Sequence, residues 1–276
     1  MPTTQRTEAA VASADGTRIS YDVQGRGPTV ILISQALADR KDHRRLAAAL
    51  APAHTVINYD RRGRGSSTDT TPWSIDCEVE DIRALIDAHG PRASLIGASA
   101  GAVLALEAAS GLGERIERVV AYEAPVIVDA ARPAVPREFA GHLGDLVREG
   151  RNSQAVAEFF RGALGISAIG ARMTRLMIPL WRSMTAMAQT TEYDLTMCHG
   201  LQDGKPLPAG RWDGVRADVL VLVGERSAPF MHSGSLAIAE HLNAKCTVVP
   251  RAHHATLTMQ PRTALPLIEE FLAHNP

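Results

Sequence analysis

The sequence is poor in cysteine and shows no excess of charge of either sign. Its 276 residues include three cysteines, Cys77, Cys198 and Cys246, which lie far apart. An odd number at such spacing forms neither a disulfide framework nor a metal-binding cluster, and it suits the reducing cytoplasm. No group of His, Cys, Asp and Glu has the spacing of a metal site either. We therefore predict a cytoplasmic protein without a metal.

Charge is nearly balanced, with 29 Lys and Arg against 30 Asp and Glu and no long block of one sign. A surface that follows nucleic-acid phosphates needs a basic stripe, so we expect no nucleic-acid partner. The stretch from Met1 to Asp15 lacks the apolar core of a signal peptide, and no apolar run is long enough to span a bilayer. We expect a small-molecule substrate as the partner and no membrane partner. A homodimer is a possible assembly.

What the chain does contain is apolar strand patterns alternating with helical ones. The run Thr29–Ile33 is continuous and apolar, as in a parallel strand buried on both faces, and Ala93–Ile96 and Ile116–Tyr122 are further predicted strands. Between them lie helical patterns such as Ile75–His89, which Ser74 caps. Hydrophobic residues make up 45% of the chain, enough for a full core. This alternation predicts an α/β fold with a mostly parallel, eight-stranded sheet flanked by helices.

The alternation stops between Val126 and Trp212, where the pattern is helical and rich in Met, Ala, Arg and Gly. An all-helical insertion in a βαβ series predicts a lid over the sheet. We therefore divide the chain into a core at residues 1–125 and 213–276 and a lid at residues 126–212. The lid's methionines, including Met173 and Met177, fit either ordinary helix packing or contact with an apolar substrate.

The most informative motif is Gly97-Ala98-Ser99-Ala100-Gly101. An apolar strand precedes it and an Ala-rich helical pattern follows, so Ser99 lies at the apex of a strand–turn–helix. Such a turn strains the backbone and exposes the hydroxyl, and the two glycines avoid collisions with neighbouring elements. A chance meeting of small residues in a tight turn is the alternative. The setting favours a nucleophile elbow at Ser99.

A serine nucleophile needs a base, and the base needs an orienting acid. In the expected chain order of nucleophile, acid and histidine, the histidine follows the last strand. His253 and His254 lie just after the apolar run that ends at Val249. We choose His254 as the base, against the alternative of a chance loop histidine.

Together these motifs resemble the α/β-hydrolase fold superfamily, in its single-lid, epoxide-hydrolase-like and lactonase-like branch. The resemblance covers nearly the whole chain and is carried by five segments: Ile31–Ala36, Tyr59–Ser67, Gly97–Gly101, Val221–Glu225 and Pro250–His254. It implies the fold predicted above and a catalytic triad in which Ser99 is the nucleophile. His254 matches the histidine of the family's Gly-x-Gly-His motif. His253 replaces the glycine before it, as a second polar contact to substrate or as a filler.

The resemblance also implies an oxyanion hole of two backbone N–H groups. One belongs to Ala100, the residue after the nucleophile. The other belongs by position to Ala36, in the loop Ser34-Gln35-Ala36 where relatives carry His-Gly-x. The missing glycine is no obstacle, because every residue except proline has an N–H. The side chains of Ser34 and Gln35 are further candidates for substrate contact.

The acid departs from the family pattern. Most relatives carry an Asp where this chain has Ser227, and a serine cannot hold an imidazolium by charge. Some branches hold their acid at the end of the strand that follows the nucleophile helix, which here places Glu123 as the acid. Glu225 is the second candidate, although it precedes the usual position. A site without a working acid is the third alternative.

The arginine-rich turn Arg61-Arg62-Gly63-Arg64-Gly65 fits an anion-binding site or a structural turn that relatives carry after the fourth strand. We favour the structural turn. Its glycines are not a dinucleotide fingerprint, since the Gly-x-Gly-x-x-Gly pattern is incomplete. No cofactor is therefore expected.

The preferred hypothesis is a serine hydrolase of the carboxylesterase or lactonase type. It would cleave an ester or lactone bond in an apolar small molecule through an acyl-enzyme, and amide or C–C cleavage would use the same parts. A serine at the elbow argues against dehalogenase and epoxide hydrolase chemistry, which in such folds uses an aspartate. The alternative is a non-hydrolytic binding protein or a pathway cyclase on the same fold, suggested by the missing aspartate.

Overall fold

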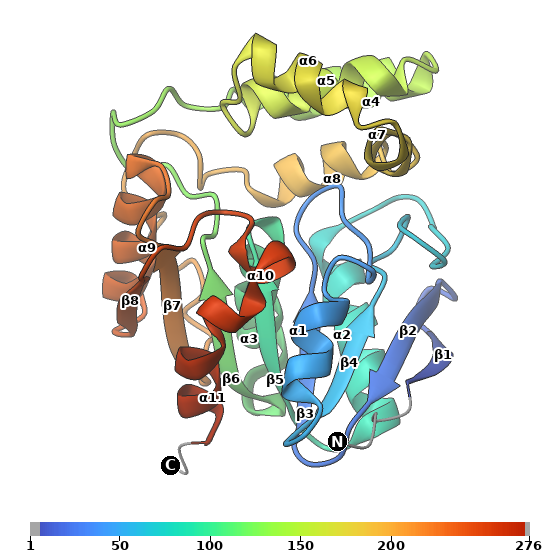
Figure 1. Cartoon of the computed structure of the whole chain (residues 1–276), viewed down its shortest axis with the longest axis vertical. Helices are drawn as coiled ribbons and strands as arrows, with labels where there is room; N and C mark the ends of the chain where they lie inside the picture. Colours follow the sequence, from blue (N-terminus) through green and yellow to red (C-terminus); the bar gives the residue numbers. More distant parts are fainter. Residues whose placement is uncertain (1–5, 274–276) are drawn as a thin grey trace.

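A sheet forms the centre of the molecule (Figure 1). The computed structural model describes residues 6–273, apart from the side chains of residues 168, 171 and 172. Over this part of the chain the sheet has eight strands in the order β1-β2-β4-β3-β5-β6-β7-β8. The strands β1 and β2 pair antiparallel, as do β2 and β4, and every pair from β4 to β8 is parallel. Their bounds are β1 Thr7–Ala12, β2 Arg18–Gln24, β3 Thr29–Ile33, β4 Thr55–Tyr59, β5 Ala93–Ala98, β6 Ile116–Tyr122, β7 Asp218–Gly224 and β8 Lys245–Val249.

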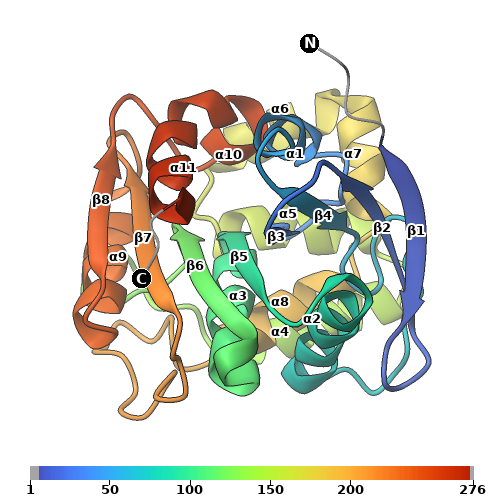
Figure 2. The ribbon, with the colours of Figure 1, turned by 90° about the horizontal axis from the view of Figure 1, so that it is seen from below.

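Helices cover both faces of this sheet, as Figure 2 shows with the strands seen from below. On one face lie α1 (Arg44–Leu50), α10 (Thr256–Met259) and α11 (Leu265–Ala273). On the other face lie α2 (Ile75–His89), α3 (Ala100–Leu112) and α9 (Pro229–His241). The predicted α/β fold, with a mostly parallel eight-stranded sheet flanked by helices, is confirmed.

Strand β3 shows why the central strands read as unbroken apolar runs. Successive side chains of a strand point to opposite faces, so a strand covered on both sides is apolar at every position. Val30 and Leu32 pack with α1 and α11, whereas Ile31 and Ile33 pack with α2 and α3. The sheet therefore separates two hydrophobic cores.

The remaining helices stand between β6 and β7 and lie beyond the carboxyl ends of the parallel strands (Figure 1). No strand interrupts the described part of residues 126–212, as the helical pattern predicts. Residues from these helices form a third apolar cluster with Leu37 and Val223 of the core. The exact division into core and lid stays a prediction. The bounds are α4 Glu138–Arg148, α5 Asn152–Gly162, α6 Ala168–Leu176, α7 Ile178–Thr185 and α8 Thr190–Met197.

Two predicted helices near the carboxyl end have different starts. The pattern predicts a helix from Ser233, but α9 begins at Pro229, since proline suits the first helical turn. The pattern also predicts a helix over residues 262–274, but α11 begins at Leu265 after a 3-10 turn. Residue 274 lies outside the described residues. None of the described helices is long and apolar enough to cross a bilayer.

Candidate active site

Ser99 lies between β5 and α3, at the carboxyl end of the central parallel strands. Its φ of 53° is in the left-handed region, which a non-glycine residue adopts only where the surroundings enforce it. Its backbone N–H donates to the carbonyl of Tyr122 on the neighbouring strand, at 2.9 Å. The sharp turn predicted from the sequence is therefore present at Ser99.

Both glycines of the motif are required by close backbone contacts. A Cβ on Gly97 would lie 2.1 Å from the carbonyl oxygen of Gly101. A Cβ on Gly101 would lie 2.3 Å from the carbonyl oxygen of Ile33 and 2.7 Å from that of Ser34. No side chain fits at such distances, so the glycines let α3 approach both β5 and the end of β3.

Glu123 and His254 lie in direct contact. Glu123 follows β6, its side chain is fully buried, and its Oε2 lies 2.7 Å from His254 Nδ1. Oε1 of the same carboxylate accepts hydrogen bonds from the N–H of Gly224, at 2.7 Å, and from the hydroxyl of Ser227. Glu123 also has a positive φ, 49°, so the backbone at the acid is strained as it is at Ser99.

Glu225, the second candidate acid, makes no hydrogen bond to His254 among the described residues. It is exposed, and its Oε2 accepts a hydrogen bond from the backbone N–H of Arg251 at 2.7 Å. Ser227 stands where relatives carry the Asp, and its hydroxyl donates to Glu123. The structure thus brings Glu123 to His254. The sequence alone indicates only that Ser227 lacks the charge of the expected Asp, and it does not predict the hydrogen bond from Ser227 to Glu123. The position of Ser227, where the acid was expected, is the one signal that could have suggested this contact.

The contacts around Glu123 keep it ionised and fix the proton of His254. Burial by itself raises the pKa of Glu123, but hydrogen bonds from His254 and Ser227 outweigh it and hold the pKa below its ordinary value. An ionised carboxylate can only accept a hydrogen bond, so Nδ1 of His254 carries the proton in this pair. The imidazole Nε2 is then free to act as a base.

Ser99 and His254, the predicted nucleophile and base, are not hydrogen-bonded to each other. Among the hydrogen bonds of the described residues, none joins Ser99 Oγ to His254. Ser99 is 5% exposed, and the side chain of His254 is 37% exposed. Catalytic hydrogen bonds are often long without substrate and tighten when it binds. Glu123 and His254 are therefore already in contact, whereas a hydrogen bond between Ser99 and His254 would have to form when substrate binds.

His253 makes hydrogen bonds that hold together the loop in which it lies. Its backbone N–H donates to Thr256 Oγ1 at 2.8 Å, and its Nδ1 accepts from the N–H of Ala255 at 3.2 Å. Its carbonyl oxygen accepts from the hydroxyl of Tyr122 at 2.7 Å. These contacts favour the structural reading of His253. They also identify Tyr122, the residue before Glu123, as an anchor of the base loop that no sequence motif indicates.

The two predicted oxyanion donors have free N–H groups. Ala100 begins α3, where the first N–H groups have no partner within the helix. Ala36 lies in the loop after β3. Among the hydrogen bonds of residues 6–273, neither N–H has a protein acceptor. Both are therefore available to a developing negative charge.

The side chains beside Ala36 are occupied within the protein. The hydroxyl of Ser34 donates to the carbonyl of Ala38 at 3.3 Å. The Oε1 of Gln35 lies 3.0 Å from Nε2 of His43, which is buried. Burial lowers the pKa of His43 to about 4, so His43 is neutral near pH 7 and donates from Nε2. The loop is thus held in place by internal contacts.

The three arginines of the turn after β4 are buried and paired with acids of this chain. Arg61 lies 2.6 Å from Glu78, Arg62 lies 2.7 Å from Asp81, and Arg64 lies 2.7 Å from Asp194. Their side chains are 0–1% exposed. These contacts favour the structural turn over a site for an external anion.

The lid methionines divide between the interior and the surface. Met187 and Trp181 pack in the third apolar cluster. Met173 and Met177 are 63% and 58% exposed, beside other exposed apolar residues of α6 and α7: Ile169, Leu176, Ile178 and Leu180. Ordinary packing therefore explains only part of the apolar pattern.

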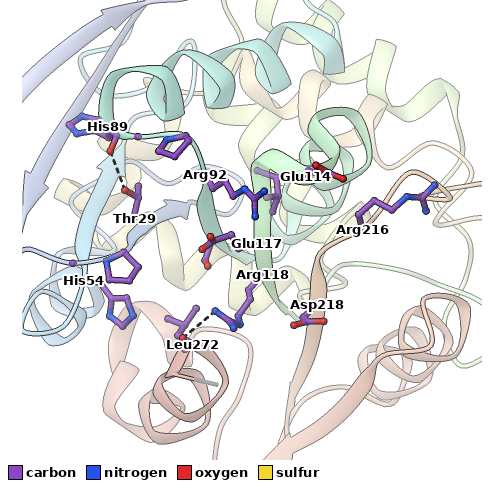
Figure 3. Close-up of a pocket in the computed structure, with 16 residues that line it drawn as sticks. Thr29, His54, His89, Arg92, Glu114, Glu117, Arg118, Arg216, Asp218 and Leu272 are labelled. Atoms are coloured by element: carbon purple, nitrogen blue, oxygen red, sulfur yellow. Dashed lines mark hydrogen bonds between the residues drawn. The ribbon is translucent and has the colours of Figure 1, made fainter. Parts of the chain in front are cut away.

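A polar cavity of about 880 Å³ lies at the opposite end of the sheet (Figure 3). Thr29, Ile116 and Asp218, which begin strands β3, β6 and β7, line it together with charged residues such as Arg92 and Glu117. None of the residues expected to be catalytic lines this cavity. Within the described residues no group of three His, Cys, Asp or Glu is arranged to hold a metal ion.

This chain is similar to a protein-family model and to solved structures, which agree on its fold. A family model described as the alpha/beta hydrolase family matches residues 36–265. An alpha/beta hydrolase structure from Sphaerobacter thermophilus DSM 20745 is 35% identical, with a TM-score of 0.87 over 96% of this chain and 100% of that chain. The epoxide hydrolase CorEH is 20% identical, with a TM-score of 0.72 over 98% of this chain and 99% of its own, a likeness of fold.

Among curated proteins, the uncharacterized hydrolase YraK of Bacillus subtilis strain 168 is 26% identical over 141 residues. The match covers 50% of this chain and 52% of YraK, so this chain spans about half the length of that relative.

The close contact at Gly101 predicts a large effect of one methyl group. Gly101→Ala should destabilise the fold by about 1–3 kcal/mol, because the Cβ meets backbone that cannot move aside. Gly141→Ala is the matched control: Gly141 lies in α4 with nothing within 4 Å of the added Cβ, and the change should stabilise by about 0.5–1 kcal/mol. Urea denaturation measures both, and equal effects would contradict the contact.

The lowered pKa of Glu123 predicts a pH-dependent contribution to stability. A carboxyl whose pKa is lower folded than unfolded stabilises the fold above the unfolded value, near 4.5, and loses that contribution as the pH falls through the folded value. Glu123→Gln should therefore cost on the order of 2 kcal/mol at pH 7 and much less below pH 4. Denaturation midpoints of the wild type and of Glu123→Gln across pH 3–7 test this, and a loss of stability that does not depend on pH would contradict it.

Proposed function

Because this chain belongs to the alpha/beta hydrolase family, we propose that it is a serine hydrolase that cleaves an ester or lactone bond through an acyl-enzyme. The observation that carries the proposal is the 2.7 Å contact between Glu123 and His254. A buried carboxylate that holds an imidazole by Nδ1 leaves its Nε2 free to take a proton from a nucleophile. Ser99, at the strand–turn–helix elbow, is the nucleophile that we propose. Dehalogenase and epoxide hydrolase chemistry in such folds uses an aspartate in place of this serine.

Each group has one role in the reaction. Ser99 Oγ attacks the substrate carbonyl carbon while His254 Nε2 takes its proton, and Glu123 stabilises the imidazolium. The N–H groups of Ala36 and Ala100 hydrogen-bond to the oxyanion. When the tetrahedral intermediate collapses, the alcohol oxygen leaves with the proton from His254, and the acyl group stays on Ser99. A water then repeats both steps and releases the acid.

The surroundings of these residues support an apolar substrate. Leu37 follows the donor Ala36, and Phe230 follows the acid loop at Ser227. Both belong to the apolar cluster that the lid helices complete. Burial of apolar substrate surface against such side chains provides binding energy without directional contacts.

Replacement of the nucleophile tests the assignment directly. Ser99→Ala should abolish turnover of p-nitrophenyl acetate and butyrate, and the folded wild type should label at Ser99 with a fluorophosphonate. Circular dichroism confirms that the variant is folded. Unchanged turnover in Ser99→Ala would overturn Ser99 as the nucleophile. A folded wild type that neither turns over these esters nor labels at Ser99 would favour a binding protein or cyclase on this fold.

A second pair of variants separates the two candidate acids. Glu123→Gln should lower kcat roughly 10⁴-fold, since the amide no longer holds the correct imidazole tautomer or its charge. Glu225→Gln should change kcat by about twofold or less, because Glu225 contacts only backbone at Arg251. Steady-state kinetics on the same esters compares them, and a larger loss in Glu225→Gln would refute the choice of Glu123.

A further inference from the structure

We infer that Arg64 and Asp194 position the Ala36 N–H for the oxyanion and couple that donor to the lid, a role that rests on the proposed hydrolase function. The side chain of Arg64 contacts the donor loop and the lid at once. Its Nη1 donates to the carbonyl oxygen of Gln35 at 2.6 Å. Its Nη2 donates to both carboxylate oxygens of Asp194, at 2.8 and 2.7 Å.

The contact with the Gln35 carbonyl determines the direction of the Ala36 N–H. The two groups belong to one planar trans peptide, in which C=O and N–H point in opposite directions. Fixing the carbonyl of Gln35 on Arg64 therefore aims the N–H of Ala36 away from the arginine. Leu37, the next residue, has a φ of 55°, so the loop is held in a conformation that free backbone seldom adopts.

The lid supplies the charge that holds Arg64 in place. Asp194 lies in α8 and is 2% exposed, and it also accepts from Arg61 Nη1 at 2.8 Å. Burial and the neighbouring charge of Arg61 lower the pKa of Arg64, and Asp194 opposes that shift. A displacement of α8 that took Asp194 away would leave two buried guanidinium groups facing Glu78 alone. The position of Arg64 thus depends on the position of the lid.

The same helix has a second attachment next to Arg64. Nε2 of Gln189, at the start of α8, donates to the carbonyl oxygen of Gly63 at 2.8 Å. Helix α8 is therefore hydrogen-bonded to the arginine turn at two adjacent residues, Gly63 and Arg64. A movement of α8 would be transmitted to Arg64 and then to the peptide that carries the Ala36 N–H.

Arg62 in the same turn provides a matched control. It is equally buried and pairs with Asp81 and Asp15, and it also donates to the carbonyl of Cys77. It makes no hydrogen bond to the loop at residues 34–36 within the described residues. A general loss of stability at the turn should follow from either Arg62→Lys or Arg64→Lys, whereas misdirection of the oxyanion donor should follow only from Arg64→Lys.

The experiment compares Arg64→Lys with Arg62→Lys, with p-nitrophenyl butyrate as substrate and a trifluoromethyl ketone as inhibitor, because the adduct of the ketone with Ser99 is an oxyanion that imitates the intermediate. Lysine keeps the charge but cannot reach Gln35 and both Asp194 oxygens as a planar fork does. Arg64→Lys should lower kcat roughly 10²-fold with KM within about twofold, and raise the ketone Ki by a similar factor. Arg62→Lys should change each by less than about threefold.

Asp194→Asn extends the test to the lid side of the contact. It keeps the shape of the side chain but weakens its hold on Arg64, so we expect a loss in kcat of about 10-fold with the same parallel rise in Ki. It also replaces Arg64→Lys as the deciding variant if the lysine variant does not fold. Thermal melts establish which variants are folded.

The outcomes separate this inference from the proposed function. Equal kcat and Ki changes in the Arg64 and Arg62 variants, or a kcat loss without a Ki rise, overturn the positioning role while hydrolysis stands. A wild type that neither hydrolyses esters nor labels at Ser99 overturns the proposed function itself, and the positioning role fails with it.

Discussion

The close approach of α3 to the end of β3 is the constraint on which the whole site depends. With no side chain at Gly101, the helix backbone lies directly against the carbonyl oxygens of Ile33 and Ser34. Protein interiors are packed too densely to accept a methyl group at such a contact without displacing backbone. This contact places the N–H at the start of α3 beside the loop that carries Ala36. The proposed nucleophile and both proposed oxyanion donors therefore depend on one backbone contact.

The carboxylate that contacts His254 follows strand β6 rather than β7. Strands β6 and β7 are parallel neighbours with Tyr122 opposite Leu222, so their carboxyl ends lie side by side. A glutamate after β6 reaches the histidine that an aspartate after β7 would otherwise contact. Ser227, in the place of that aspartate, donates to Glu123 and so helps to keep it ionised. Ser227, which follows β7, thus supports a charge that follows β6.

Sequence reasoning worked where one local pattern determines one local structure. The strand–turn–helix at Ser99, the buried strands and the helical insertion follow from apolar periodicity and glycine spacing. The family resemblance favours Glu123 over Glu225 as the acid, but the contact of Glu123 with His254 follows from which strand ends are neighbours and is seen only in the structure. The contact of Arg64 with Gln35 and Asp194 joins positions 29 and 130 residues apart, and no local pattern records it.

The buried charges of the arginine turn are a poor source of stability, since well-packed apolar side chains often do as well. What apolar side chains cannot do is hold a carbonyl oxygen in a fixed direction. Arg64 does so at Gln35, and it stays charged in the interior because Asp194 lies against it. Helix α8 is therefore the part of the lid that contacts the core directly, through Asp194 and Gln189. An apolar replacement of this pair could preserve the fold and still lose the aim of the oxyanion donor.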